Sequence, residues 1–110
     1  VSGAFHSPFM DKPSSQFSEY LKQIKFHNPS FPVISNYEPS LCSDPNELKI
    51  RLEKQMCNGV RWRETMDLMA KDSDLHIVEI GPSNVLSGLG KRHLKDVKIS
   101  QVSSSDQISY

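Results

Sequence analysis

The sequence has few of the residues on which disulfide scaffolds, membrane spans and nucleic-acid-binding surfaces depend. It has only two cysteines, and their spacing fits neither a disulfide framework nor a common metal site. Thirteen lysines and arginines balance thirteen aspartates and glutamates, so no excess charge favours nucleic acid or an anionic membrane. No apolar run approaches the roughly 20 residues of a membrane-spanning helix. We therefore expect free thiols, no metal, and neither nucleic acid nor membrane as a partner.

The residues that are present fit a folded α/β protein. Hydrophobic residues make up 36% of the 110 positions and charged residues 24%, a balance typical of a globular domain. Apolar residues at three- and four-residue steps predict helices, and short apolar runs predict strands. The predicted helices lie at about 13–25, 44–58, 62–70 and 83–93, and the predicted strands at 31–36, 75–80 and 97–102. Such alternation is typical of an open, mostly parallel sheet with flanking helices.

Capping residues mark several of the predicted helix ends. Asp44 can accept a hydrogen bond from the first turn of the second helix, and Glu47 can reach back to the same turn. Gly59 predicts the end of that helix through a left-handed backbone. Ser83 and Asn84 are the candidate caps of the last helix.

Two predicted strands end where an α/β sheet places ligands. The first ends at 34–36, in Ile-Ser-Asn, and the second at 79–82, in Glu-Ile-Gly-Pro. Ligands of open parallel sheets bind outside the carboxyl ends of the strands. Asn36 is therefore a candidate binding residue, whereas the glycine at the second strand end is equally well explained by a plain turn.

His6 is the residue hardest to explain by packing alone. It lies in Gly-Ala-Phe-His-Ser-Pro at 3–8, which suits neither a strand nor the interior of a helix. The segment predicts a loop that carries His6 to a fixed position just before a helix. Because catalytic groups are often carried on loops held by a rigid scaffold, His6 is a candidate catalytic residue.

Four segments of the chain, in order, resemble those of a known enzyme family. They are Gly-Ala-Phe-His-Ser-Pro at 3–8, Pro-Val-Ile-Ser-Asn at 32–36, Gln-Met-Cys-Asn-Gly-Val-Arg-Trp at 55–62 and Glu-Ile-Gly-Pro-Ser-Asn-Val-Leu-Ser-Gly-Leu at 79–89. Together they resemble the malonyl-coenzyme A:acyl carrier protein transacylases, and they are similar to the acyltransferase domains of polyketide synthases. The match extends along nearly the whole chain.

The resemblance implies acyl transfer through a serine and a histidine. In this family a serine attacks malonyl-CoA, a malonyl-serine forms, and the phosphopantetheine thiol of acyl carrier protein removes the malonyl group. His6 would be the general acid/base, because imidazole accepts and returns a proton near neutral pH. The backbone carbonyl of Gln55 would orient its ring. The resemblance implies no bound cofactor, since malonyl-CoA and phosphopantetheinylated carrier protein are substrates.

The resemblance also implies residues that contact the substrate. Phe5 precedes the histidine, where an aromatic residue in polyketide acyltransferases goes with malonyl rather than methylmalonyl. Asn36 ends the matching strand. We therefore expect Phe5 and Asn36 to be substrate-binding residues; the alternative for Phe5 is that it only packs the loop.

We expect the chain to be the C-terminal part of the family's large α/β-hydrolase-like subdomain. Residues 1–102 would form this portion and 103–110 a polar C-terminal tail. No Gly-x-Ser-x-Gly pattern is present, so the nucleophilic serine would lie upstream of Val1. The 110 residues alone are therefore expected to be inactive.

Several alternatives stay open at this point. The chain could belong to a polyketide synthase acyltransferase domain, or be a non-catalytic module that binds a carrier protein. The implied partners are acyl carrier protein and malonyl-CoA, and the full-length enzyme is expected to be monomeric. The implied location is intracellular, in the bacterial cytoplasm or the mitochondrial matrix.

Overall fold

The computed structural model describes residues 4–108, and the chain divides into two compact units. The first unit extends to Thr65 and the second begins at Met66. Each unit has its own helices and its own two-stranded sheet.

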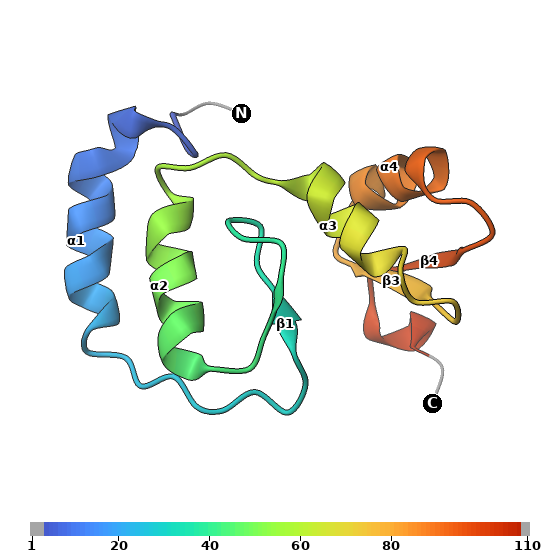
Figure 1. The fold of residues 1–110 in the computed structure, drawn as a ribbon, viewed down its shortest axis with the longest axis horizontal. Helices are drawn as coiled ribbons and strands as arrows, with labels where there is room; N and C mark the ends of the chain where they lie inside the picture. The colour runs from blue at the N-terminus through green and yellow to red at the C-terminus, as the bar shows by residue number, and fades with distance from the viewer. Residues whose placement is uncertain (1–3, 109–110) are drawn as a thin grey trace. The chain divides into compact units, whose positions relative to one another are not determined.

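Two helices lie side by side in the first unit (Figure 1). A short 3-10 helix, Pro8–Met10, leads directly into α1, Asp11–Leu21, and α2 spans Pro45–Gln55. The first predicted helix is thus confirmed, but it starts before 13 and ends before 25. Proline is tolerated in the first turn of a helix, so Pro13 does not mark its first residue.

The first predicted strand is short, and its partner differs from the expected one. β1, Val33–Ile34, pairs with β2, Leu41–Cys42, in an antiparallel hairpin in which Val33 faces Cys42. The expected pairing was parallel. Consecutive strands joined by a short turn can only pair antiparallel, because a parallel partner requires a crossover of a dozen or more residues.

The start of α2 is confirmed, although its capping interactions are only partly those expected. The side chain of Asp44 accepts a hydrogen bond from the backbone N–H of Asn46 at 2.9 Å. Glu47 does not reach back to this turn. Its carboxylate lies 3.4 Å from Nε of Arg51, one helical turn further on.

The end of α2 is not made by a left-handed glycine. The prediction for Gly59 is wrong, since among the described glycines only Gly81 has a positive φ. Instead, the side-chain amide of Asn58 donates to the carbonyl of Lys54 at 2.6 Å. The backbone N–H of Cys57 reaches the same carbonyl only at 3.3 Å, so the side chain supplies the shorter hydrogen bond at this helix end.

The second unit contains a βαβ arrangement. β3, His76–Ile80, and β4, Lys98–Val102, pair in parallel, and α4, Val85–His93, connects them and packs on both. α3, Trp62–Met69, contains the boundary between the units. A Cβ added at Gly90 would lie 3.0 Å from Cδ1 of Ile99, so glycine lets α4 approach β4 closely.

The cap of α4 comes from a strand rather than from the residues directly before the helix. Asn84 occupies the cap position but makes no side-chain cap bond, and no such bond is made by Ser83 either. The carboxylate of Glu79 accepts the backbone N–H of Ser87 at 2.8 Å and that of Leu86 at 3.3 Å. A carboxylate at this position also complements the positive end of the helix dipole.

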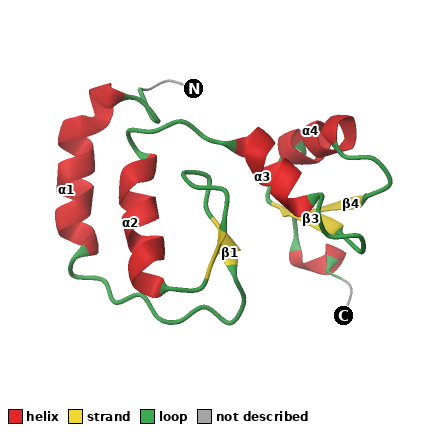
Figure 2. Ribbon diagram, in the orientation of Figure 1, coloured by secondary structure: helices red, strands yellow, loops and turns green. Residues whose placement is uncertain are grey.

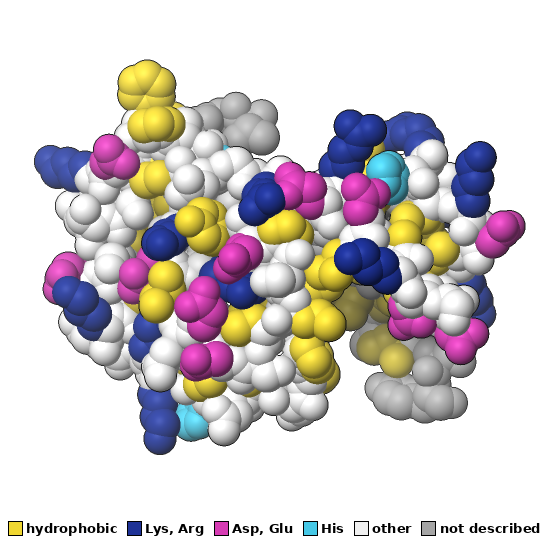
Figure 3. Space-filling view, viewed as in Figure 1, with side chains coloured by type: hydrophobic (Ala, Val, Ile, Leu, Met, Phe, Trp, Pro, Cys, Tyr) yellow, Lys and Arg dark blue, Asp and Glu magenta, His cyan; other side chains and the backbone are white. Residues whose placement is uncertain are grey.

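Helices combined with a small parallel sheet confirm the predicted α/β class (Figure 2). The buried apolar side chains of the described residues are few: Leu21, Cys42, Met66 and Leu94. Figure 3 shows acidic and basic side chains interspersed on one face, with apolar side chains exposed between them. None of the helices in residues 4–108 is long and apolar enough to cross a membrane.

Candidate functional site

His6 has a backbone conformation that few residues other than glycine adopt. Its φ is 65°, in the left-handed region, which costs an L-residue about 1–2 kcal/mol. The hydroxyl of Ser7 donates to the carbonyl of Ala4, and the chain enters the 3-10 helix at Pro8. A strained conformation of this kind persists only where the surroundings enforce it, and such residues cluster at functional sites.

The C-terminal end of α2 holds both the backbone and the ring of His6. The backbone N–H of His6 donates to the carbonyl of Met56 at 2.8 Å, and Nδ1 lies 2.8 Å from the carbonyl oxygen of Gln55. The last carbonyls of a helix have no partners within the helix. His6 therefore satisfies two of them, and in return α2 fixes the position and the orientation of the ring.

The contact with the Gln55 carbonyl decides which ring nitrogen carries the proton. A carbonyl oxygen only accepts, so Nδ1 must be the donor. The side-chain Nε2 of Gln55 is also 3.4 Å from Nδ1, but both groups would then be donors, so this second contact is not a hydrogen bond. In the neutral ring, Nε2 of His6 is left with a free lone pair, as a general base requires.

An open recess of about 420 Å³ in the first unit brings two further candidate residues together. Its apolar lining includes Val33, Ile34 and Leu48, and its polar lining includes Asn36 and Gln55. The residue that contacts His6 therefore also borders a space suited to a partly apolar ligand.

The four predicted site residues thus differ in how the structure places them. His6 contacts Gln55, and Gln55 shares the recess with Asn36. Phe5 is 57% exposed and does not line this recess. The substrate-binding roles of Phe5 and Asn36 stay predictions.

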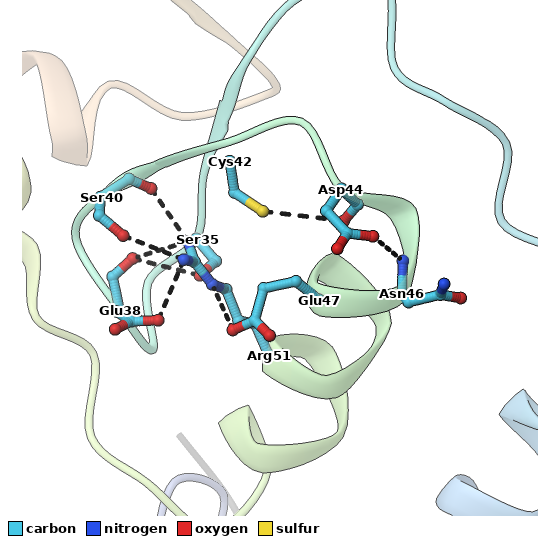
Figure 4. A network of polar contacts seen from close by, with 8 residues as sticks. All are labelled: Ser35, Glu38, Ser40, Cys42, Asp44, Asn46, Glu47 and Arg51. Carbon is cyan, nitrogen blue, oxygen red and sulfur yellow. Dashed lines mark hydrogen bonds and ion pairs between the residues drawn. The ribbon is translucent and has the colours of Figure 1, made fainter.

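Arg51 is a residue of this region whose importance the sequence did not reveal. It is 6% exposed, and its guanidinium is the centre of a polar network (Figure 4). Nη1 donates to the Ser40 carbonyl at 2.9 Å, while Nη2 donates to the Ser40 hydroxyl and approaches the Glu38 carboxylate, both at 3.0 Å. The four-residue step from Glu47 predicts a helical ion pair, but nothing local predicts burial of the guanidinium.

The Arg51 network anchors the turn at 35–40, which follows β1. Ser35 closes the same turn by donating its hydroxyl to the Glu38 carbonyl at 3.3 Å. Asn36 lies in this turn, and its carbonyl accepts the backbone N–H of Arg61 at 2.9 Å. Arg51 therefore fixes the wall of the recess from within the unit.

Other reactive groups of the region are not arranged for nucleophilic or metal chemistry. Burial raises the pKa of the Cys57 thiol, and the carboxylate of Asp11, 3.3 Å from Sγ, raises it further. The thiolate is the nucleophilic form, so Cys57 is poorly suited to attack at neutral pH. In the part of the chain that the structure describes, no group of His, Cys, Asp and Glu is placed to hold a metal ion.

Comparison with known proteins gives close relatives of one kind. No protein-family model matches the chain. The malonyl CoA-acyl carrier protein transacylase of Synechocystis is 39% identical over 109 residues, which are 99% of this chain and 37% of that protein. The polyketide biosynthesis malonyl CoA-acyl carrier protein transacylase PksC of Bacillus subtilis is 38% identical over 101 residues, which are 89% of this chain and 34% of that protein.

Solved structures agree with the sequence relatives. The crystal structure of the Synechocystis malonyl-CoA:ACP transacylase superposes with a TM-score of 0.90 at 40% identity, covering 96% of this chain and 36% of that one. A type II polyketide synthase acyl carrier protein in complex with its malonyl-transacylase superposes with a TM-score of 0.87 at 29% identity, covering 96% and 34%.

The chain spans little more than a third of the length of the relatives it matches. Within that span the similarity is continuous in sequence and in fold, so the α/β units are a portion of an acyltransferase fold. Along nearly its whole length, the chain matches a portion of the malonyl CoA-acyl carrier protein transacylases in sequence and in fold.

Proposed function

We propose that this chain supplies the histidine general acid/base for transfer of a malonyl group from malonyl-CoA to acyl carrier protein. The observation that carries the proposal is the 2.8 Å contact between Nδ1 of His6 and the Gln55 carbonyl. It fixes the proton on Nδ1 and leaves Nε2 free to exchange a proton with the reacting groups.

In the proposed reaction, a serine outside these 110 residues attacks the thioester carbonyl of malonyl-CoA. Nε2 of His6 takes the serine proton as the Oγ–C bond forms. When the C–S bond breaks, His6 returns this proton to the leaving CoA thiolate. The phosphopantetheine thiol then gives its proton to Nε2 and attacks the malonyl ester, and the released serine oxygen recovers the proton. Positioned proton transfer of this kind contributes roughly 10²–10⁴-fold to the rate.

The orienting group in this proposal is a neutral carbonyl instead of a carboxylate. An aspartate in this position orients the ring and also stabilises the imidazolium by its charge. The Gln55 carbonyl supplies the orientation, while the charge stabilisation is reduced to that of a backbone dipole. Accurate placement of this carbonyl therefore matters more than it would in a Ser-His-Asp site.

The proposal extends to the substrate side. Phe5, next to His6, would disfavour an α-methyl group beside the acyl chain, a selection worth about 1–3 kcal/mol. The recess bordered by Asn36 and Gln55 would accept part of the substrate. The reaction needs no bound cofactor.

The partner in the proposal is acyl carrier protein, and a solved relative is a malonyl-transacylase in complex with such a protein. The named relatives come from bacteria, which favours the bacterial cytoplasm over the mitochondrial matrix. Polyketide synthesis is the alternative process, supported by the similarity to PksC. A non-catalytic carrier-protein-binding module is the other alternative, and it would not need an oriented imidazole.

A chimaeric enzyme tests the proposal. This chain replaces the aligned 109 residues of the Synechocystis transacylase, and malonyl transfer to acyl carrier protein is measured. We expect an active chimaera, and we expect His6→Ala to lower kcat by about 10²-fold or more, because the proton-transfer group is lost. The 110-residue chain assayed alone should be inactive.

His27→Ala is the matched control, since His27 is exposed and makes no hydrogen bond among the described residues. It should leave kcat unchanged. Near-normal turnover of the His6→Ala chimaera would overturn the proposal and favour the non-catalytic module.

A further inference from the structure

Two side chains hold the turn that follows α2, and the backbone carbonyls that contact His6 lie within the segment they join. We infer that the side chains of Gln55 and Asn58 form a clasp that positions the two backbone carbonyls holding His6. Both are then positioning residues, acting on the proton-transfer group through the backbone. The catalytic consequence of the clasp rests on the proposed function, whereas its effect on the His6 ring does not.

The clasp consists of reciprocal side-chain to backbone hydrogen bonds. Nε2 of Gln55 donates to the carbonyl of Asn58 at 2.9 Å and approaches that of Gly59 at 3.3 Å. Nδ2 of Asn58 donates back to the carbonyl of Lys54 at 2.6 Å. Each side chain therefore hydrogen-bonds to the backbone of the segment that carries the other side chain. Together these bonds close residues 54–59 into a ring of contacts.

The chemistry of the neighbours fixes which way the Gln55 amide points. The groups facing its end are the carbonyl oxygens of Asn58 and Gly59, both acceptors. Only the NH₂ end can satisfy them, because Oε1 in that place would face two acceptors. In this orientation the amide NH₂ also faces Nδ1–H of His6. Two donors cannot form a hydrogen bond, so the side chain cannot replace the backbone carbonyl as the partner of the ring.

This helix end needs side chains because it lacks the usual backbone solution. Many helices end with a residue in the left-handed conformation, usually glycine, whose backbone N–H groups satisfy the last carbonyls. Met56, the C-cap of α2, keeps a right-handed backbone with φ of −62° and ψ of −30°, and Gly59 has no positive φ. Backbone N–H groups make only long contacts here, from Cys57 to the Lys54 carbonyl at 3.3 Å and from Asn58 to the Gln55 carbonyl at 3.4 Å. The Asn58 amide and His6 therefore supply the shorter hydrogen bonds to these carbonyls.

The clasp has a consequence for His6 because both of its anchors lie inside the ring of contacts. The carbonyls of Gln55 and Met56 fall between Lys54 and Asn58, the residues that the clasp joins. His6 itself is in a strained conformation and depends on these anchors. Loosening the turn should therefore release the ring, although no contact to the ring itself is removed.

Asn58→Asp is the sharpest variant, since it is isosteric, removes the donor to the Lys54 carbonyl and places a negative charge against that carbonyl. The matched control is Asn46→Asp at the other end of α2, where the side chain makes no hydrogen bond among residues 4–108. In the chimaera we expect Asn58→Asp to lower kcat about tenfold with KM unchanged, the effect of about one lost hydrogen bond. Asn46→Asp should leave both unchanged.

A measurement on the ring separates positioning from general structural damage. In the chimaera labelled with ¹⁵N-histidine, the nitrogen shifts of His6, assigned by their absence in His6→Ala, should show the proton on Nδ1 above neutral pH. Asn58→Asp should shift the population toward the Nε2–H form, while Asn46→Asp should not. Helix content by circular dichroism should stay at the wild-type level in both variants.

Gln55→Met, which places no hydrogen-bond acceptor beside Nδ1 of His6, repeats the test from the other side and serves if Asn58→Asp fails to fold. It removes the donor to the Asn58 carbonyl and keeps the backbone carbonyl that accepts from His6. We expect the same shift of tautomer.

The possible failures are distinguishable. Unchanged tautomer and unchanged kcat in the Asn58→Asp variant would overturn the clasp, and loss of activity in His6→Ala would still support the proposed function. Full activity of His6→Ala would overturn the proposed function, and the tautomer shift in the Asn58→Asp variant would still support the clasp.

Discussion

In each unit a charged side chain holds a turn or a helix start by binding backbone groups, and the sign of its charge differs between the units. The sign depends on whether the backbone groups are carbonyls or N–H groups. In the first unit a cation, Arg51, meets the carbonyls of the turn at 35–40. In the second unit an anion, Glu79, meets the N–H groups at the start of α4. Each side chain supplies the charge that the unpaired backbone groups attract.

The comparison also shows a difference in burial. Arg51 is nearly inaccessible to water, so its hydrogen bonds are hard to replace when the side chain is removed. Glu79 is partly exposed, and water can take over part of its role. We therefore expect the first unit to depend more strongly on its charge than the second unit does.

Arg51→Met should have the largest effect on stability. The variant removes the partner of the Ser40 carbonyl and the countercharge of the Glu38 carboxylate, and it should lower the free energy of unfolding of the first unit by about 3 kcal/mol. Hydrogen exchange measured by mass spectrometry should show faster exchange in peptides covering 35–42. Peptides of the second unit should be unaffected.

Two arginine variants control this prediction. Arg51→Lys keeps the charge but loses the planar fork, so the loss should be smaller. Arg61→Met removes an exposed ion pair with Glu64 and should change exchange at 35–42 very little. An Arg51→Met variant with wild-type exchange would contradict the structural role of the buried cation.

Gly81→Ala should have an intermediate effect, confined to the second unit. Gly81 has a φ of 152°, and its N–H donates to the Val102 carbonyl at 2.9 Å. An L-residue is strained at this φ, so we expect a loss of about 1–3 kcal/mol in thermal or chemical unfolding. Open space around its Cβ does not relieve this strain.

Gly88→Ala is the control with the opposite sign. Gly88 lies inside α4, and nothing is within 4 Å of its added Cβ. Alanine should stabilise the helix by about 0.5–1 kcal/mol. A Gly81→Ala variant as stable as the wild type, or stabilised as Gly88→Ala is expected to be, would disprove the special role of the backbone at Gly81.

The pH dependence of the second unit should be the smallest effect. Hydrogen bonds from the Ser87 hydroxyl and from the backbone N–H groups of Ser87 and Leu86 lower the pKa of Glu79 below its usual value of 4.5. The folded state thus favours the ionised form, and its stabilisation is present above pH 4.5 and lost as the pH falls through the lowered pKa.

Glu79→Gln should remove this contribution. Unfolding of the second unit, measured from neutral pH to below pH 4, should then vary less with pH than in the wild type. An unchanged pH profile would show that the carboxylate is not a significant cap of α4.

The sequence predicted the local elements well where one residue decides the outcome. Asp44 marks the start of α2, and short apolar runs mark β3 and β4 as expected. It failed where the decisive partner is distant. The residues around α4 do not indicate that Glu79 caps the helix in place of Ser83 and Asn84. The residues of β1 likewise do not indicate its antiparallel partner.

The candidate site shows the same division. His6 stands out in the sequence because its neighbours suit neither helix nor strand, and the resemblance to the family identifies Gln55 as its partner. Arg51 looks like an ordinary exposed helical arginine in the sequence, because burial depends on what packs over it. Asn58 looks like a turn residue, and its role in closing the end of α2 follows only from the contact with Lys54.

The sequence by itself determined the α/β class, the positions of most helices and strands, and the histidine loop, since these depend on periodicity, capping residues and motifs over a few positions. Only the tertiary structure decided which groups satisfy the unpaired carbonyls and N–H groups at the helix ends. His6 and Gln55 are 49 positions apart, and only folding brings Nδ1 of one to the carbonyl of the other. The physical reason is that backbone groups must find partners in space, and the sequence order does not specify which side chain is near enough to provide them.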